Sequence, residues 1–168
     1  KVTNIDLVGK EKIALEIDNS KKENEQSNII NNLYYKSIDE KGNEYILKAE
    51  SGEKADNKNL LKLYKVKAEI KLANKNTILI NSNFADYNSA TFDTNFYQNI
   101  NGSYEDNTFS SENLDLLFKD NKAIMYNSIK FYNKTIDANA DEIVFDLLNG
   151  NVNINMFDKN EKIIIKKE

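Results

Sequence analysis

The sequence predicts an all-β fold built from antiparallel strands. Two observations lead to this fold class: apolar and polar residues alternate along much of the chain, and short turn sequences separate the alternating runs. The chain has 168 residues, of which 40% are hydrophobic, so it is long and apolar enough to bury a core. We therefore expect one folded domain over residues 1–168.

The alternation has a period of two residues. It is longest at residues 65–72 and 151–156, and it recurs in shorter form at Ile78–Ile80, Ile129–Phe131 and Ile163–Ile165. One apolar face and one polar face are typical of a half-buried antiparallel strand. The segments Asn59–Tyr64 and Asp141–Leu148 do not alternate cleanly and resemble short helices, but we predict strands because clear strands flank both.

Short turn sequences separate these alternating runs. They lie at residues 41–43, 74–76, 105–107, 120–121 and 149–151. Because the chain has only 5 Gly, we expect Asn to supply many of the turn positions with positive φ. Near the N-terminus, residues 1–18 are predicted to form an edge strand pair and residues 19–28 a polar loop. The sequence of strands and turns favours a sandwich, a barrel or a roll.

An internal repeat connects the strands. Three blocks of eight residues, Ile80–Tyr87, Phe109–Leu116 and Ile136–Ile143, begin and end with an apolar residue and have a small third residue. The small residues are Ser82, Ser111 and Ala138, with Ala49 in a fourth partial copy, and the β-branched residues that follow them are Ile100, Ile129, Val152 and, after Ala49, Val66. Such a period indicates stacked β units that share one core.

Composition excludes several kinds of chemistry. The net charge is −4, the charges of both signs are interspersed, and no Arg is present, which disfavours nucleic acid as a partner. Without His or Cys, the chain lacks the usual nucleophile and base pairs, and it has no Gly-rich phosphate loop. We therefore expect a non-enzymatic protein with no cofactor and no metal.

Four motifs in order resemble a known family. Residues 42–49 read G-x-x-Y-x-L-x-A, residues 66–70 read V-x-A-x-I, residues 80–87 read I-x-S-x-x-A-x-Y, and residues 138–146 read ANADEIVFD. This pattern, over about residues 33–165, is similar to the periplasmic lipopolysaccharide-transport proteins of the LptC, LptA and OstA type. The first motif resembles LptC, the member anchored in the inner membrane.

The resemblance implies a fold and a role. The fold would be an OstA-like roll, a twisted antiparallel β-jellyroll with an apolar interior groove. The role would be that of a periplasmic bridge component, tethered by an N-terminal helix that this chain does not include. It would pass lipopolysaccharide from the inner-membrane ABC transporter complex to a soluble periplasmic bridge protein.

The resemblance also suggests which residues would act. We expect the lipid-binding groove to be lined by Leu47, Ala49, Val66, Ala68, Ile70, Ile80, Ser82, Phe92, Phe96, Phe109, Leu116, Ile129, Phe131, Ile136, Ala138, Ile143, Ile154 and Met156. The partner-binding edges would contain Ile5, Leu7, Ile13 and Leu15 on the transporter side and Ile163 and Ile165 on the side of the soluble bridge. An ordinary packed core is the other interpretation of the apolar set.

Three alternatives stay open at this point. The chain can be a structural β-roll or solenoid module without lipid cargo. It can also be a polysaccharide-active β-roll that uses carboxylates such as Asp115, Asp137 and Asp141. Within the resembled family, it can be a fully soluble bridge protein instead of the anchored one.

Overall fold

The computed structural model describes residues 14–15, 29–55, 59–73, 76–157 and 164–165, and this part of the chain contains strands and turns but no helix. The strands are β1 (Ala14–Leu15), β2 (Ile29–Ile38), β3 (Glu44–Lys54), β4 (Leu60–Lys71), β5 (Thr77–Asn88), β6 (Thr94–Tyr104), β7 (Asn107–Leu117), β8 (Lys122–Tyr132), β9 (Ile136–Asp146), β10 (Asn151–Asn155) and β11 (Ile164–Ile165).

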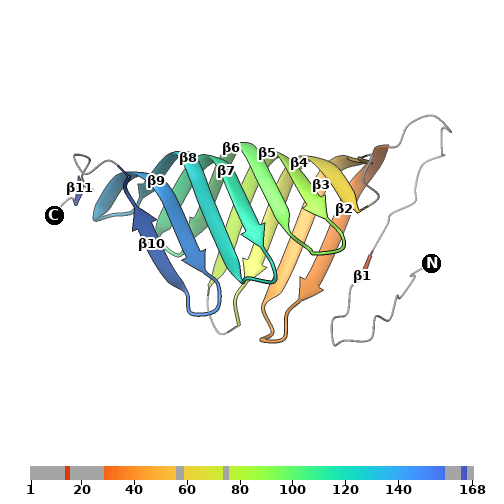
Figure 1. The fold of residues 1–168 in the computed structure, drawn as a ribbon, viewed down its shortest axis with the longest axis horizontal. Coiled ribbons are helices and arrows are strands. Elements are labelled where there is room, and N and C mark those ends of the chain that lie inside the picture. Colours follow the sequence, from red (N-terminus) through yellow and green to blue (C-terminus); the bar gives the residue numbers. More distant parts are fainter. Residues whose placement is uncertain (1–13, 16–28, 56–58, 74–75, 158–163, 166–168) are drawn as a thin grey trace.

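All strands belong to one antiparallel sheet. Its order from β1 to β10 follows the sequence, and β11 pairs with β9 beside β10 (Figure 1). The predicted all-β antiparallel fold is therefore confirmed. Both ambiguous segments are strands as predicted, because β4 begins at Leu60 and β9 continues to Asp146, where the chain turns.

A row of irregular residues crosses the middle of the sheet. The register shifts at Gln98–Asn99 in β6 and at Asn127–Ser128 in β8, and all four residues have a positive φ. Asn32 in β2 and Lys65 in β4 continue the row with φ of 54° and 52°. Bulges of this kind bend a strand and increase its twist. We call this row the corner.

The corner divides every long strand into two halves and the sheet into two walls. The first wall ends at the turns of residues 39–43, 105–106 and 133–135, and the second at those of residues 89–93, 118–121 and 147–150. Figure 1 shows the sheet rolled up, with one half behind the other. Ring contacts join the walls: Tyr35 lies 4.8 Å from Tyr87, and Phe109 lies 5.7 Å from Phe145, between ring centroids.

The core fills the space between the walls. The alternating residues of both walls point inward, and side chains such as Leu63, Met125 and Ile143 are fully buried. Polar residues alternate with them on the outer faces. The period-two pattern of the sequence thus becomes one apolar interior shared by two halves of the same sheet.

The repeat found in the sequence corresponds to a row of residues beside the corner. Large and small side chains alternate along it, in the order Leu33, Ala49, Val66, Ser82, Ile100, Ser111, Ile129 and Ala140. The hydroxyl groups of Ser82 and Ser111 donate to the carbonyl oxygens of Phe84 (2.8 Å) and Asn113 (3.0 Å) in their own strands. The small residues therefore leave room on the inside of the bend, and the two serine hydroxyl groups stabilise it by hydrogen bonds.

Two details of the predicted repeat are wrong. Ala140, not Ala138, pairs with Ile129, so the third block is two residues out of register and its structural counterpart is residues 138–145. Val152 is not part of the row, because it pairs with Phe145 and its side chain is 39% exposed.

The predicted role of Asn at turns is also largely wrong in the described residues. Of the asparagines with positive φ, Asn121 lies in a turn, whereas Asn32, Asn99 and Asn127 lie within strands at the corner. Asn tolerates this conformation better than most residues, and the bend of the sheet uses that tolerance.

Candidate functional site

The predicted groove residues gather on the inner faces of the two walls. Fourteen of the eighteen are buried: Leu47, Ala49, Val66, Ala68, Ile70, Ile80, Ser82, Phe96, Phe109, Leu116, Ile129, Phe131, Ala138 and Ile143. Phe92, Ile136, Ile154 and Met156 are partly buried against the same core. The set is thus brought together in space, and its contact with a lipid stays a prediction.

Phe92 reaches the core from a turn and not from a strand. It occupies the turn between β5 and β6 with a φ of 65°. The Phe92 amide donates to the carbonyl oxygen of Asn88 (2.7 Å), and the ring packs against Phe118 with 5.3 Å between centroids. The sequence pattern missed this turn because the run of residues 89–93 has no Gly.

One cavity between the walls is small. It measures about 30 Å³ and is lined mainly by aromatic and aliphatic residues that include Tyr35, Tyr45, Tyr87, Phe96 and Phe118. That volume suits roughly one or two water molecules. An acyl chain therefore needs the walls to move apart before it can occupy this space.

A larger pocket lies opposite the corner, where the free ends of the two walls approach each other. It measures about 330 Å³ and is lined by Asp39, Glu40, Lys41, Phe118, Lys119, Asn121 and Leu148. We call this region the mouth. The sequence marked residues 41–43 and 120–121 as turns but contained no signal that these turns, far apart in the chain, lie side by side.

The carboxylate of Asp39 organises the first-wall side of the mouth. It accepts hydrogen bonds from the amides of Lys41 and Asn43 (both 2.9 Å), from the Asn43 side chain (2.7 Å) and from the Tyr45 hydroxyl (3.2 Å). Asn43 Oδ1 in turn accepts from the amide of Ala73 (2.7 Å). Burial and the neighbouring Asp39 raise the pKa of Tyr45, so its hydroxyl keeps its proton and its hydrogen bond.

The predicted partner-binding edges are only partly within the described residues. Leu15 lies in β1 opposite Tyr35, and Ile165 lies in β11 opposite Ile136. The other four, Ile5, Leu7, Ile13 and Ile163, lie outside the described residues, as do most of the predicted N-terminal strand pair and the polar loop. Their role in binding partners stays a prediction.

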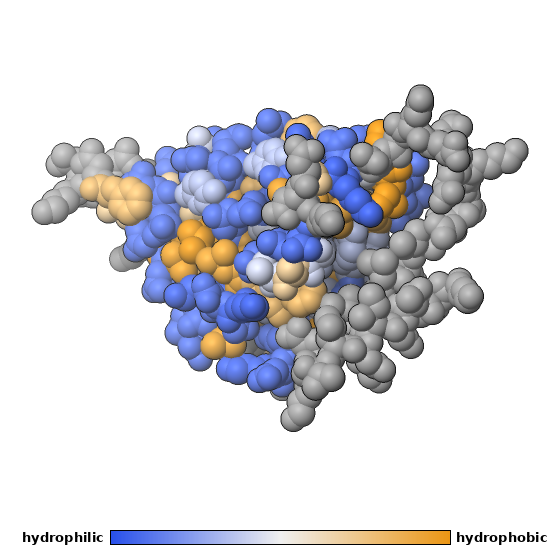
Figure 2. All heavy atoms as spheres, turned by 45° about the vertical axis from the view of Figure 1, so that its right-hand side comes forward, coloured by the Kyte–Doolittle hydropathy of each residue, from blue (hydrophilic) through white to orange (hydrophobic). Residues whose placement is uncertain are grey.

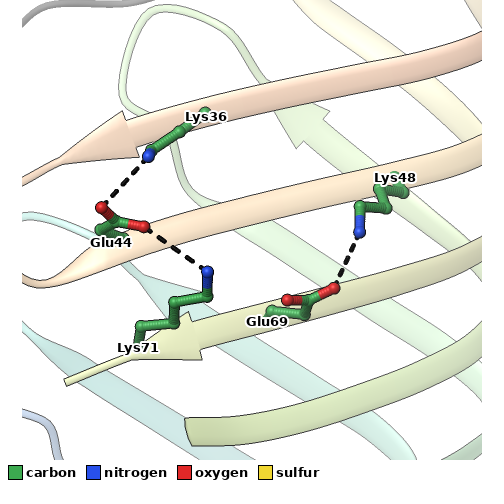
Figure 3. A network of polar contacts seen from close by, with 5 residues as sticks. All are labelled: Lys36, Glu44, Lys48, Glu69 and Lys71. Atoms are coloured by element: carbon green, nitrogen blue, oxygen red, sulfur yellow. Dashed lines mark hydrogen bonds and ion pairs between the residues drawn. The ribbon is translucent and has the colours of Figure 1, made fainter.

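The outer faces are mainly polar. In the view of Figure 2, hydrophilic residues cover most of the surface and hydrophobic residues form smaller separate areas. On the first wall, Glu44 pairs with Lys36 (3.1 Å) and Lys71 (3.7 Å), and Lys48 pairs with Glu69 (2.8 Å), as Figure 3 shows. The hydrogen bond from Lys48 lowers the pKa of Glu69. Such exposed pairs contribute little to stability.

The carboxylates considered for glycan chemistry do not form one site. Asp115 in β7 accepts from Asn95 (2.9 Å) and from the Tyr126 hydroxyl (3.3 Å), whereas Asp141 in β9 accepts from the amide of Phe157 (2.6 Å). Strand β8 separates Asp115 from β9, which also contains Asp137. Within the described ranges, no group of three or more acidic side chains is placed to hold a metal ion, and no helix is long and apolar enough to cross a membrane.

The fold and site define an all-β antiparallel roll with an apolar interior. No protein-family model and no curated protein matches this chain. Among solved structures, it is similar to LptH of Pseudomonas aeruginosa, described as the LptA-homologous periplasmic component of the conserved lipopolysaccharide transport device. The TM-score is 0.42 and the sequence identity 12%, over 93% of this chain and 94% of LptH.

Proposed function

We propose that this protein is a non-enzymatic, periplasmic lipid-binding bridge component of lipopolysaccharide export. It takes lipopolysaccharide from the inner-membrane ABC transporter complex and passes it along its apolar interior to the next bridge protein. One observation carries the proposal: a continuous set of buried apolar residues lies between two walls, and the long strands β2 to β9 pass from one wall to the other at the corner. The resemblance of the sequence motifs to the LptC, LptA and OstA type supports lipopolysaccharide as the cargo.

The free energy of burying an acyl chain and the loss of contacts between the walls together suit transient binding of a lipid. Burying an acyl chain stabilises a complex by ~0.8 kcal/mol per CH₂ group. Because the cavity between the walls holds only about 30 Å³, a chain must replace contacts between the walls, such as that of Tyr35 with Tyr87. The loss of those contacts offsets part of the gain. A lipid is then held less tightly than its apolar area alone would suggest, and it can be passed on.

The ends of the sheet support the proposed partners. A sheet that does not close leaves backbone groups at its two edges, where another chain can add a strand. We assign the N-terminal edge, with Ile5, Leu7, Ile13 and Leu15, to the transporter complex and the C-terminal edge, with Ile163 and Ile165, to the soluble bridge protein. The resemblance of residues 42–49 to LptC favours an inner-membrane tether over a fully soluble bridge.

The test uses pairs of neighbouring residues in one strand. Phe96 and Phe131 point into the interior, whereas the adjacent Asn95 and Lys130 point outward. A photo-crosslinking residue at each of the four positions is incubated with lipopolysaccharide or with a phospholipid. We expect capture of lipopolysaccharide at positions 96 and 131 and little at 95 and 130. Equal capture on both faces, or capture at none, contradicts the proposal.

A second candidate function is a β-roll interaction module without lipid cargo. The packed interior, with its cavity of about 30 Å³, favours it. Native mass spectrometry of the folded protein with lipopolysaccharide separates the two functions. A one-to-one adduct that prefers lipopolysaccharide over phospholipid supports the bridge, and a folded protein without any adduct supports the module.

A further inference from the structure

The same side chains separate the interior cavity from the mouth pocket. Phe118 lines both spaces, and Tyr45 lines the cavity while its hydroxyl bonds to Asp39 of the pocket. The two rings meet edge to face, with 4.8 Å between centroids and 66° between planes. Tyr45 belongs to the first wall and Phe118 to the end of the second, so this pair closes the roll at the point where the walls meet.

Each side of the mouth is fixed to its own wall. On the first wall, Asp39 bonds within its turn and Asn43 bonds to Ala73. On the second wall, the Phe118 amide donates to Asp93 Oδ1 (2.9 Å), and the Leu147 amide donates to the Asn121 carbonyl oxygen (2.9 Å). The rings can therefore part without breaking any of these hydrogen bonds. A rotation of Phe118 toward the pocket has about 330 Å³ of space to enter.

The pocket has the chemistry of a site for an amphiphile. Lys41 comes from the first wall and Lys119 from the second, and neither takes part in an ion pair within the described residues. Asp39 and Glu40 oppose the two cations, so the charged side chains that line the pocket balance. The Asp39 carboxylate already accepts hydrogen bonds from Lys41, Asn43 and Tyr45, which leaves the two lysine ammonium groups available to a ligand. Phe118 and Leu148 add an apolar surface. One ammonium group from each wall beside an apolar surface suits a phosphate or carboxylate joined to an acyl chain.

We propose that the mouth pocket receives the anionic head group of a lipid and that the Tyr45–Phe118 ring pair is the gate through which its acyl chain reaches the interior. The inference rests on the proposed function and deepens it, because it assigns the point of uptake and the residues that control it. Head group and chain are recognised separately, by Lys41 and Lys119 on one side of the gate and by the core on the other.

The gate is tested by uptake kinetics of the full chain. The probe is a lysophosphatidic acid with a pyrene-labelled chain, followed by stopped-flow fluorescence. Phe118→Ala removes the gate ring, and Phe118→Leu retains most of its bulk. Phe84→Ala is the matched control, because the Phe84 ring packs on Tyr64 and Tyr97 of its own wall, away from the mouth. We expect uptake about tenfold faster in Phe118→Ala, less change in Phe118→Leu and little change in Phe84→Ala.

The head-group site is tested by selectivity. The double variant Lys41→Gln and Lys119→Gln should bind the lipid phosphate about fivefold more weakly and the matching uncharged monoacylglycerol unchanged. The control is Lys67→Gln with Lys130→Gln, which are exposed on the outer face of the first wall. Equal effects of the two double variants overturn the head-group site, and equal uptake rates of Phe118→Ala and Phe84→Ala overturn the gate.

These outcomes are distinguishable from failure of the proposed function. If the folded wild type gives no adduct with lipopolysaccharide in native mass spectrometry and takes up no lysophosphatidic acid, the bridge function fails and the inference fails with it. If the wild type binds lipid but no mouth variant changes uptake or selectivity, the function stands and the inference alone is overturned. Thermal unfolding of each variant identifies any that do not fold, and Phe118→Leu then replaces Phe118→Ala.

Discussion

The corner and the mouth both connect the two walls, but they do so by different means. At the corner, every long strand continues from one wall into the other, and Ser82 and Ser111 add side-chain hydrogen bonds across the bend. At the mouth, Tyr45 and Phe118 meet through their rings, while the neighbouring hydrogen bonds stay within one wall. The difference indicates the side on which the roll would open: continuous strands form a hinge at the corner, whereas side-chain contacts join the walls at the mouth.

The largest expected effect tests the rigidity of the hinged side. Gly102 in β6 lies two residues from Ile100 of the corner row, and an added Cβ would overlap the Phe109 ring and lie 2.5 Å from the Leu79 carbonyl oxygen. We expect Gly102→Ala to lower the free energy of unfolding by about 3 kcal/mol. Urea denaturation measures this change.

The matched control is Gly42→Ala in the mouth turn. No atom lies within 4 Å of its added Cβ, so only the φ of +84° opposes the change. That conformation costs about 1 kcal/mol for a residue with a side chain. A larger loss in Gly42→Ala than in Gly102→Ala would reverse the comparison between the two regions.

A smaller effect tests the bulges themselves. Ser128 in β8 has a φ of 54°, so we expect Ser128→Val to destabilise the protein by about 1.5 kcal/mol, because a β-branched residue fits this conformation poorly. Ser110→Val is the control, since Ser110 lies in β7 and its φ is not positive. Val suits such a strand, and we expect a change below about 0.5 kcal/mol. Equal losses in chemical denaturation would show that the corner is not strained.

The smallest effect concerns the mouth and depends on pH. Burial raises the pKa of Tyr45 above its ordinary value of 10.0, and Asp39 adds to the shift, so the folded state favours the neutral phenol. Its contribution is complete below pH 10 and is lost as pH rises above that value, when the phenol of the unfolded chain ionises first. Tyr45→Phe should cost about 1 kcal/mol at neutral pH and make the alkaline loss of stability shallower.

Thermal unfolding between pH 7 and pH 12 measures this profile. Tyr87→Phe provides a second case, because burial also raises the pKa of Tyr87, which contacts Tyr35 across the walls. An alkaline slope in Tyr45→Phe that equals the wild-type slope would show that the phenol is not held neutral in the folded protein.

The corner could be predicted from the sequence more fully than the mouth. Strand alternation is local, and the inside of a bend needs a small residue, so Ser82 and Ser111 were found by their spacing. The third block was misplaced because Ala138 and Ala140 are both small and both point inward. A shift by two residues preserves the face of a strand, and the sequence pattern cannot detect it.

The mouth depends on the curvature of the whole sheet. Lys41 and Lys119 come together only because the corner turns the free end of one wall toward the other. No period in the sequence connects two turns that far apart. The same reason explains why the gate ring of Phe118 was absent from the predicted groove residues, whereas its neighbour in β7, Leu116, was included.

The sequential strand order also determines how such a molecule can change length. Each strand of the main body bonds to the strands before and after it in the chain, and the corner crosses them in a single row. A duplicated hairpin with one bulge would therefore add two strands, about 10 Å, without altering the cross-section. Gain or loss of hairpins would thus change the length of the roll in steps of one hairpin.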